Sequence, residues 1–329
     1  VLDCCVEDLF SLAPTEDIIE GTLIGHLPKT ERTQPIRVKV STVGKRTVVR
    51  PVTDLGEQFS FAVRADGYVN ETSSKRSGDT IRVKLSRDRE AIQQEISVAG
   101  CDPSIFLVGE HLRRHKDRTT VIGWTMGSMA ALQALQRGEV HVAGMHLFDP
   151  VTGESNMPFL RRSLKGSGYD VVTFATWEEG FLVRRGNPKS IRTAADLAEP
   201  MVTLVNREAG SGARLLLDQR LRASDVAPTK VQGYDHTVST HFEVARAIAG
   251  RQADVGIGIR STAQLFDLDF VPLQAARYDL VVPKSHLKSH PTLTHLFETL
   301  VSRPFRKEIE ALGGYDTSET GKLQALRVA

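Results

Sequence analysis

From Ile96 to the C-terminus, short apolar runs alternate with stretches of helical periodicity, and this alternation constrains the fold more than any other feature. The first three strands are predicted at Ile96–Ala99, Thr120–Trp124 and Val140–Ala143. Predicted helices lie between them. Strands that alternate with helices are typical of α/β folds built on a parallel sheet. We therefore predict an α/β fold for residues 96–329.

One strand–turn–helix unit carries the strongest candidate binding site. Val202–Val205 predicts a buried strand, Gly210–Gly212 a tight turn, and Leu215–Leu221 a helix. The first backbone N–H groups of a helix lack intrahelical partners, and its dipole adds partial positive charge, so this turn suits an anion. In the alternative interpretation, the serine of the turn only caps the helix. The candidate ligand-binding residues of this unit are Asn206, Arg207, Ser211, Gly212 and Arg214.

Two further predicted helix starts carry small or hydroxyl residues. One is Gly127-Ser128, and the other is Thr240-His241, where Thr240 and Glu243 form a capping-box pattern. The carboxyl ends of parallel strands lie at one edge of a sheet, so these helix starts are expected to face one crevice. Gly127, Ser128, Thr240 and His241 therefore join the candidate ligand-binding residues, although a packing role for His241 remains an alternative.

The region before Ile96 follows a different pattern. Alternating or β-branched runs at Ile36–Val40, Thr47–Arg50, Phe59–Val63 and Thr80–Leu85 predict strands separated by glycine-containing turns. We predict a small antiparallel β domain here. Its mild basic excess is more typical of a solvated β face than of a DNA-binding surface, because no aromatic residues are interleaved with it.

Composition excludes several classes of protein. The 329 residues carry a formal net charge of +2, so the chain is not the polycation that nucleic-acid binding would favour. No apolar run is long enough to span a bilayer, and the first ten residues are acidic where a signal peptide would be basic. Cys4 and Cys5 are adjacent and Cys101 stands alone, so no disulfide framework is predicted. We expect a cytoplasmic protein without a membrane partner.

The sequence gives little support for a hydrolase, nucleotide-binding or metal site. Neither Ser128 nor Ser211 lies in a Gly-x-Ser-x-Gly motif, and the sequence contains no phosphate-binding loop of the nucleotide-hydrolase kind. His141, His146 and Asp149 could bind a metal, but satisfied core or loop histidines are the preferred interpretation.

Glu178 and Glu179 are adjacent on an extended segment and point to opposite sides, so they are not predicted to form an acid–base pair. We predict no enzyme, no catalytic residues, no metal and no cofactor.

Several stretches resemble the periplasmic-binding-protein-like domain found in bacterial transcriptional regulators. They are Asn206–Asp218, Gly144–Leu147, Gly180–Pro188, Asp254–Ile259 and Phe305–Asp316. The similarity runs from about Ile96 to the C-terminus. Residues 1–12 resemble the last helix of an XRE-type helix-turn-helix, whose recognition helix would lie before residue 1.

The resemblance implies a two-lobed type II binding-protein fold that holds molybdate, tungstate or a similar small oxyanion between its lobes. Gly127 and Ser128 would serve one lobe, and the donors of the 206–214 stretch the other. The sequence departs from the family at Glu208-Ala209 and Ala213, where related chains more often carry Gln-Pro and Thr.

These observations together predict three parts. Residues 1–12 end a helix-turn-helix, residues 13–95 form a linker and β domain, and residues 96–329 form the binding domain. Its first lobe comprises about 96–183 and 273–329, and its second lobe about 184–272, with a hinge near Arg184–Pro188 and a return crossing near Pro272.

The predicted function is a homodimeric, ligand-responsive transcriptional regulator whose upstream helix-turn-helix contacts DNA. The alternatives are a solute-binding subunit of an ABC-type transporter and, less favoured, an enzyme that uses the same crevice for a phosphorylated substrate.

Overall fold

The computed structural model describes residues 17–27, 35–70, 74–115, 119–165, 168–324 and 326. The chain divides into two compact units, Val1–Gln93 and Gln94–Ala329, and each unit has its own hydrophobic core. The helix predicted for residues 1–12 lies outside the described residues. No described helix is both long and apolar enough to pass through a bilayer.

The first unit is a closed barrel with the strand order β1-β3-β2-β4-β5. Its elements are β1 (Ile18–Leu23), β2 (Ile36–Val43), β3 (Arg46–Pro51), η1 (Val52–Leu55), α2 (Glu57–Ala62), β4 (Gly67–Val69), β5 (Thr80–Leu85) and α3 (Arg89–Gln93). The strand pairs are antiparallel apart from β1 and β3, which pair in parallel. Alternating side chains such as Val38, Val40, Ile81 and Val83 fill the core.

Two features of the barrel bear on the predictions. The strand predicted at Phe59–Val63 is wrong, because this segment belongs to helix α2. Five residues of alternation do not distinguish a short helix from a strand. Inside the barrel, the fully buried Asp66 accepts a hydrogen bond from Lys39 at 2.8 Å and is paired with Arg87.

The second unit is built on an eight-stranded sheet. Six of its strands follow the order β14-β11-β15-β8-β6-β7, and the other two, β16 and β17, pair with β11. Its larger strands are β6 (Ile96–Gly100), β7 (Val121–Thr125), β8 (Val142–Met145), β11 (Tyr169–Val183), β14 (Val255–Ile259) and β15 (Asp269–Pro283). Only β7, β6 and β8 are parallel to one another, whereas β15, β11 and β14 pair in antiparallel fashion. The alternation of strands and helices had predicted a parallel sheet. The sheet is instead mixed.

Helices and short elements surround this sheet. The helices are α4 (Ile105–His115), α5 (Ser128–Gln136), α6 (Met157–Ser163), η2 (Ala194–Ala198), α7 (Gly212–Ala223), η3 (Pro228–Lys230), α8 (His241–Ala249), α9 (Arg260–Leu265), α10 (Lys284–Ser289), α11 (Leu293–Leu300) and α12 (Arg303–Ala311). The short strands are β9 (Phe148–Asp149), β10 (Glu154–Ser155), β12 (Asn206–Arg207), β13 (Thr237–Val238), β16 (Tyr315–Asp316) and β17 (Leu323–Gln324). The strand predicted at Val202–Val205 is reduced to one bridge between Leu204 and Val255.

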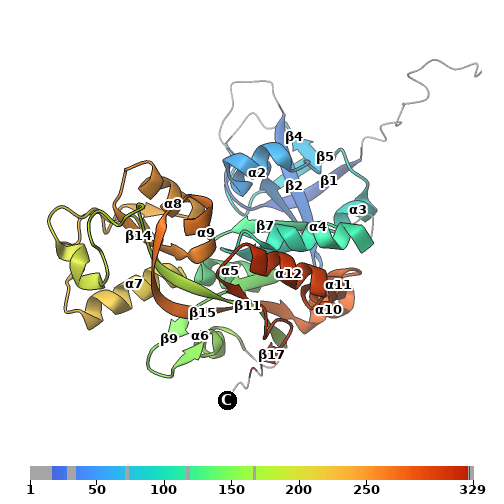
Figure 1. The fold of residues 1–329 in the computed structure, drawn as a ribbon. Coiled ribbons are helices and arrows are strands. Elements are labelled where there is room, and N and C mark those ends of the chain that lie inside the picture. The colour runs from blue at the N-terminus through green and yellow to red at the C-terminus, as the bar shows by residue number, and fades with distance from the viewer. Residues whose placement is uncertain are drawn as a thin grey trace, which may run out of the picture. The chain divides into compact units, whose positions relative to one another are not determined.

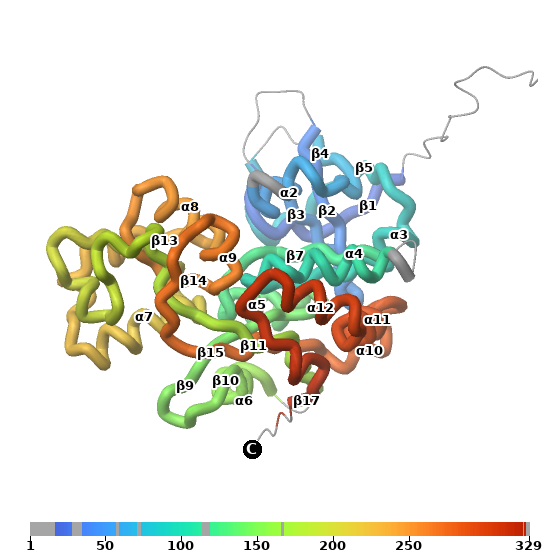
Figure 2. Tube along the Cα trace, in the orientation of Figure 1, coloured from blue at the N-terminus to red at the C-terminus, as the bar shows by residue number. Residues whose placement is uncertain are grey.

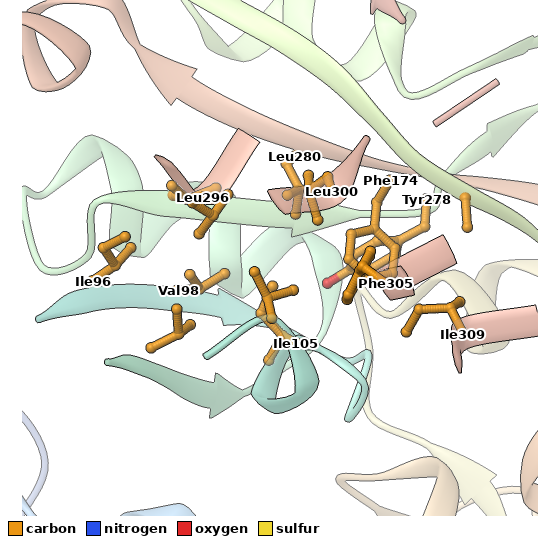
Figure 3. Packing of buried hydrophobic residues seen from close by; sticks show 14 of the residues in the cluster. Ile96, Val98, Ile105, Phe174, Tyr278, Leu280, Leu296, Leu300, Phe305 and Ile309 are labelled. Carbon is orange, nitrogen blue, oxygen red and sulfur yellow. The ribbon is translucent and has the colours of Figure 1, made fainter. Parts of the chain in front are cut away.

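The second unit contains separate cores on two sides, which define two lobes. In lobe 1, α4, α11 and α12 pack on β6, β8 and the first half of β11, and Figure 3 shows Phe174, Tyr278 and Phe305 of this core side by side. In lobe 2, α7 and α8 pack near β14. Figures 1 and 2 show β11 and β15 running from one lobe into the other.

The chain passes between the lobes earlier than predicted. Trp177 belongs to the core of lobe 1, whereas Phe181 and Val183 belong to a core of lobe 2. The β11–β15 register also shifts between Glu179 and Gly180. The crossing along β11 therefore lies near Glu179, a few residues before the hinge predicted at Arg184–Pro188.

Candidate functional site

The helix starts singled out in the sequence meet where the two lobes touch. Gly127, before α5 of lobe 1, faces Ser211, before α7 of lobe 2, so closely that a Cβ on Gly127 would lie 3.2 Å from Ser211 Cβ. A Cβ on Gly212 would lie only 2.4 Å from the backbone oxygen of His146 in lobe 1. Met129 N also donates to the Gly210 carbonyl at 3.3 Å. The starts of α5 and α7 therefore meet, as predicted, and glycine allows their close approach.

The predicted hydroxyl groups are used within the protein. Ser128 Oγ accepts a hydrogen bond from His146 N at 3.1 Å. Ser211 Oγ donates to the Glu208 carbonyl and accepts from Arg214 N, so it caps α7. Thr240 caps α8 in a capping box with Glu243. These residues shape the helix starts, which is the alternative interpretation that the sequence had left open for the serine.

Asn206 and Arg214 are also engaged away from the lobe contact. Asn206 Nδ2 donates to the Tyr234 carbonyl at 2.9 Å, and its Oδ1 accepts from Arg207 N. The Arg214 guanidinium lies 4.1 Å from the centroid of the Tyr234 ring and bonds to Asp218 at 3.2 Å. Their side chains hold lobe 2 together, in contrast to the predicted ligand contacts.

Arg207 and His241 differ from the other predicted residues because they keep free polar atoms in the interior. Each is 1% exposed. Glu208 binds Arg207 Nε and Nη2 at 2.8 and 3.0 Å, and the Ser239 carbonyl accepts from Nη2. Among the described residues, Arg207 Nη1 and both ring nitrogens of His241 have no hydrogen-bond partner. A buried donor without a partner costs about 1–3 kcal/mol.

Lobe 1 and the crossing strand add four buried residues that the sequence had not assigned to the site. Trp177 and Glu179 lie on β11, Cys101 directly follows β6, and His146 directly follows β8. The His146 ring centroid lies 5.0 Å from that of Trp177 and 6.0 Å from that of His241. Within the described chain, Trp177 Nε1 and His146 Nε2 have no hydrogen-bond partner. The rule that placed the helix starts at one edge of the sheet applies equally to Cys101 and His146.

Electrostatics differ sharply between the two histidines. Burial lowers the pKa of His146, but Cys101 and Glu179, whose Oε1 lies 2.9 Å from His146 Nδ1, outweigh it and raise the pKa to about 10. Burial, then the Arg207 guanidinium and His146, hold the pKa of His241 well below its usual value. The two neighbouring imidazoles therefore have pKa values shifted in opposite directions, upward for His146 and downward for His241.

His141, His146 and Asp149, which the sequence offered as metal ligands, do not form one cluster in the described structure. His141 Nδ1 accepts a hydrogen bond from Ser97 N at 3.0 Å, which confirms a satisfied core histidine. Asp149 Oδ1 accepts from Val151 N and so closes its own turn. His146 instead lies with Cys101 and His241.

The glutamate pair behaves as expected, because Glu178 pairs with Arg260 near the surface while Glu179 points inward.

The two-lobed arrangement agrees with a comparison of the sequence with known families. Residues 109–301, more than half of the chain, match the model of the PBP superfamily domain, where PBP denotes periplasmic binding protein. The chain belongs to the PBP superfamily. Its fold is a mixed α/β, two-lobed type II binding-protein domain preceded by a small β-barrel. Family membership assigns neither a ligand nor a role to the chain.

Known proteins similar to this PBP chain include YvgK of Bacillus subtilis, an uncharacterized protein. It is 34% identical over 228 residues, which cover 69% of this chain and 73% of YvgK. A phosphate-bound putative ABC transporter substrate-binding protein of Clostridium perfringens is 11% identical, with a TM-score of 0.49 and coverage of 66% and 97% of the two chains. Peroxide-bound OxyR of Corynebacterium glutamicum is 14% identical, with a TM-score of 0.47 and coverage of 66% of each chain. These two structures assign no ligand to the PBP chain described here.

Proposed function

We propose that the second unit is a receptor for a small oxyanion, which it binds between its two lobes. One observation carries the proposal: Arg207 Nη1 and Trp177 Nε1 are buried there without a partner in the described chain. Guanidinium and indole N–H groups can only donate hydrogen bonds. A ligand rich in acceptor oxygens would satisfy both, whereas an apolar ligand would leave both unsatisfied.

The charges around the lobe contact favour a ligand that is small and negatively charged. The Glu208 carboxylate holds Arg207 on two nitrogens and leaves Nη1 as its free donor. Arg207 keeps its charge and turns one unused N–H group inward. Glu208 thus orients Arg207 for the anion.

Molybdate and tungstate are the proposed ligands, with sulfate and phosphate as the competing tetrahedral anions. Calorimetric titration with these four anions tests the proposal. Replacing Arg207 with glutamine removes a charge-assisted hydrogen bond worth about 1.5–3 kcal/mol, which is roughly 10- to 150-fold in Kd. The same substitution at the exposed Arg222, later in α7, is the matched control and leaves the affinity unchanged. Absence of heat with all four anions, or equal affinity of the Arg207→Gln variant, contradicts the proposal.

We also propose that this receptor is part of a cytoplasmic, homodimeric transcriptional regulator. The support is the resemblance of residues 1–12 to the end of a helix-turn-helix. A ligand that closes the lobes changes DNA binding only if it binds one conformation more tightly. The coding sequence upstream of Val1 tests this role, since an encoded helix-turn-helix supports the regulator and an export signal supports a transporter subunit. Sedimentation of the full-length protein tests the dimer.

A further inference from the structure

Three buried side chains with metal-binding atoms meet beneath the lobe contact. Cys101 Sγ and one ring nitrogen each of His146 and His241 lie within 4.8 Å of one another. Cys101 and His146 follow parallel strands of lobe 1, and His241 begins α8 of lobe 2. Their residues are 2, 3 and 1% exposed, so water competes little for these atoms.

We propose that Cys101, His146 and His241 form a binding site for a thiophilic metal ion, Zn²⁺ or Cu⁺. Thiolate and imidazole are the ligands that select these ions over Mg²⁺ and Ca²⁺. With Zn–S near 2.3 Å and Zn–N near 2.0 Å, a sulfur and a nitrogen ligand of a tetrahedral site lie about 3.5 Å apart. The three ligand atoms, which lie within 4.8 Å of one another, therefore need to approach by up to about 1.5 Å to bind one ion.

The second observation concerns the hydrogen bonding of the ring nitrogens of His146 and His241. His146 Nδ1 faces Glu179 Oε1 at 2.9 Å, and Gln274 donates to the other oxygen of Glu179 at 3.2 Å. His146 Nε2 and both nitrogens of His241 have no hydrogen-bond partner in the described part of the chain. A carboxylate on one imidazole nitrogen and a metal on the other is the usual arrangement of a metal-bound histidine.

The charges of the proposed assembly balance. A divalent ion would meet the thiolate of Cys101 and the carboxylate of Glu179, one negative charge each. Arg207, which lies near His241, is already paired with Glu208. Three protein ligands would also leave one coordination position open for an exchangeable ligand. Because the ligands come from both lobes, the ion would hold the lobes together.

This site goes beyond the proposed anion binding, and the two are measured separately. The anion contacts are N–H groups of Arg207 and Trp177, which repel a cation, whereas the metal ligands are a sulfur and two imidazole nitrogens. Metal binding is measured on chelator-treated protein in buffer free of oxyanions. A failure of either measurement then leaves the other standing.

The test is a titration with Zn²⁺ in competition with a chromophoric chelator. We expect one Zn²⁺ per chain, at least about 100-fold weaker binding in Cys101→Ser, and about 10- to 100-fold weaker binding in Glu179→Gln, whose residue only orients His146. His236→Gln removes an exposed histidine of lobe 2 and serves as the control with unchanged affinity. Zn²⁺ binding that is absent, or equal in Cys101→Ser and the unaltered chain, overturns the proposal.

A spectroscopic measurement keeps the proposal testable if Cys101→Ser does not fold. Co²⁺ bound to a thiolate shows a sulfur-to-metal charge-transfer band in the near ultraviolet. We expect this band in a variant with Cys4 and Cys5 both replaced by serine, since Cys101 is then the only thiol of the chain. Absence of the band in this folded variant shows that Cys101 does not bind the metal.

Discussion

Replacing Gly212 with alanine tests whether the lobes must meet for the ligand to bind. Gly212 is the first residue of α7 in lobe 2 and lies against His146 of lobe 1. An added Cβ would come to 2.4 Å from the His146 backbone oxygen and to 2.5 Å from a ring carbon. A backbone atom cannot rotate away, so the lobes have to separate.

The size of the effect follows from the overlap. Ordinary contact of a Cβ begins near 3.4 Å, so the lobes must part by about 1 Å at this point. Overpacking of this kind costs about 1–3 kcal/mol, which is roughly 5- to 150-fold in affinity. The open form avoids the clash, and alanine favours a helix over glycine by up to about 1 kcal/mol. The variant is therefore expected to unfold at the same temperature or higher while binding the anion more weakly.

Two measurements separate these effects. Calorimetry with molybdate gives the affinity, and emission from Trp177, which is 1% exposed at the lobe contact, reports its exposure to water. We expect weaker binding and red-shifted emission in Gly212→Ala. Gly127→Ala is expected to have a smaller effect, because its Cβ meets the movable Glu208 carboxylate at 2.7 Å and Ser211 at 3.2 Å. Gly168→Ala meets no atom within 4 Å and is the matched control.

The reasoning has a clear point of failure. If Gly212→Ala binds molybdate as tightly as the unaltered chain and its emission is unchanged, the lobes do not close onto His146 when the ligand binds. If the variant instead unfolds more easily than the Gly168→Ala control, the contact supports the fold of the unit and does not report on closure.

Two further predictions concern stability. Asp66→Ala takes the carboxylate partner from the buried Lys39, so the free energy of unfolding is expected to fall by about 3–5 kcal/mol. Asp17→Ala, which breaks an exposed ion pair, is the control with a much smaller loss, and equal losses in chemical denaturation would contradict this. Burial lowers the pKa of His290 from 6.5, so near that pH the folded chain binds fewer protons at this residue than the unfolded chain. The free energy of unfolding is therefore expected to be highest above pH 6.5 and to decrease as the pH falls below it. In thermal unfolding from pH 7.5 to 5, His290→Gln is expected to show a shallower loss, and an unchanged slope would exclude His290 as its source.

Local motifs were predictable from the sequence because neighbouring residues form them. The capping box of Thr240 and Glu243 and the cap of Ser211 follow from residue types three positions apart. The meeting of the starts of α5 and α7 was also predicted, although the rule about parallel strand ends that led to it does not describe this mixed sheet. The strand predicted at Phe59–Val63 was wrong because its five residues also fit a short helix.

The chemistry of the site was less predictable because distant residues make it. Arg214 and Arg207 look alike in the sequence, yet Arg214 stacks on Tyr234 and only Arg207 keeps a free buried donor. The sequence correctly predicted that the side chains of Glu178 and Glu179 point to opposite sides, and Glu179 was therefore not counted among the site residues. Because Glu178 lies near the surface, this same alternation places Glu179 in the interior beside His146. Only the antiparallel pairing of β11 with β15, which the alternation did not predict, brings Trp177 and Glu179 between the lobes.

In the proposed receptor, closing the lobes without a ligand would carry a free-energy cost that the anion would remove. Arg207 Nη1, Trp177 Nε1 and the His241 ring are buried without partners in the described chain. At about 1–3 kcal/mol for each of the three side chains, these unsatisfied groups would raise the free energy of a closed form without ligand by roughly 3–9 kcal/mol. This is comparable with the ~5.5 kcal/mol that reverses a 99:1 equilibrium between two conformations. In the proposed regulator, an anion that satisfied them would provide the differential affinity that a switch needs.

Trp177→Phe keeps an aromatic ring at the lobe contact but removes one of these unsatisfied donors. It should therefore weaken molybdate binding by about 0.5–1.5 kcal/mol and make the empty protein more compact in X-ray scattering. The Trp124→Phe variant, altered at a residue whose indole N–H already bonds to Ser97, is the comparison. An empty Trp177→Phe protein as open as the unaltered chain would show that unsatisfied donors do not hold the lobes apart.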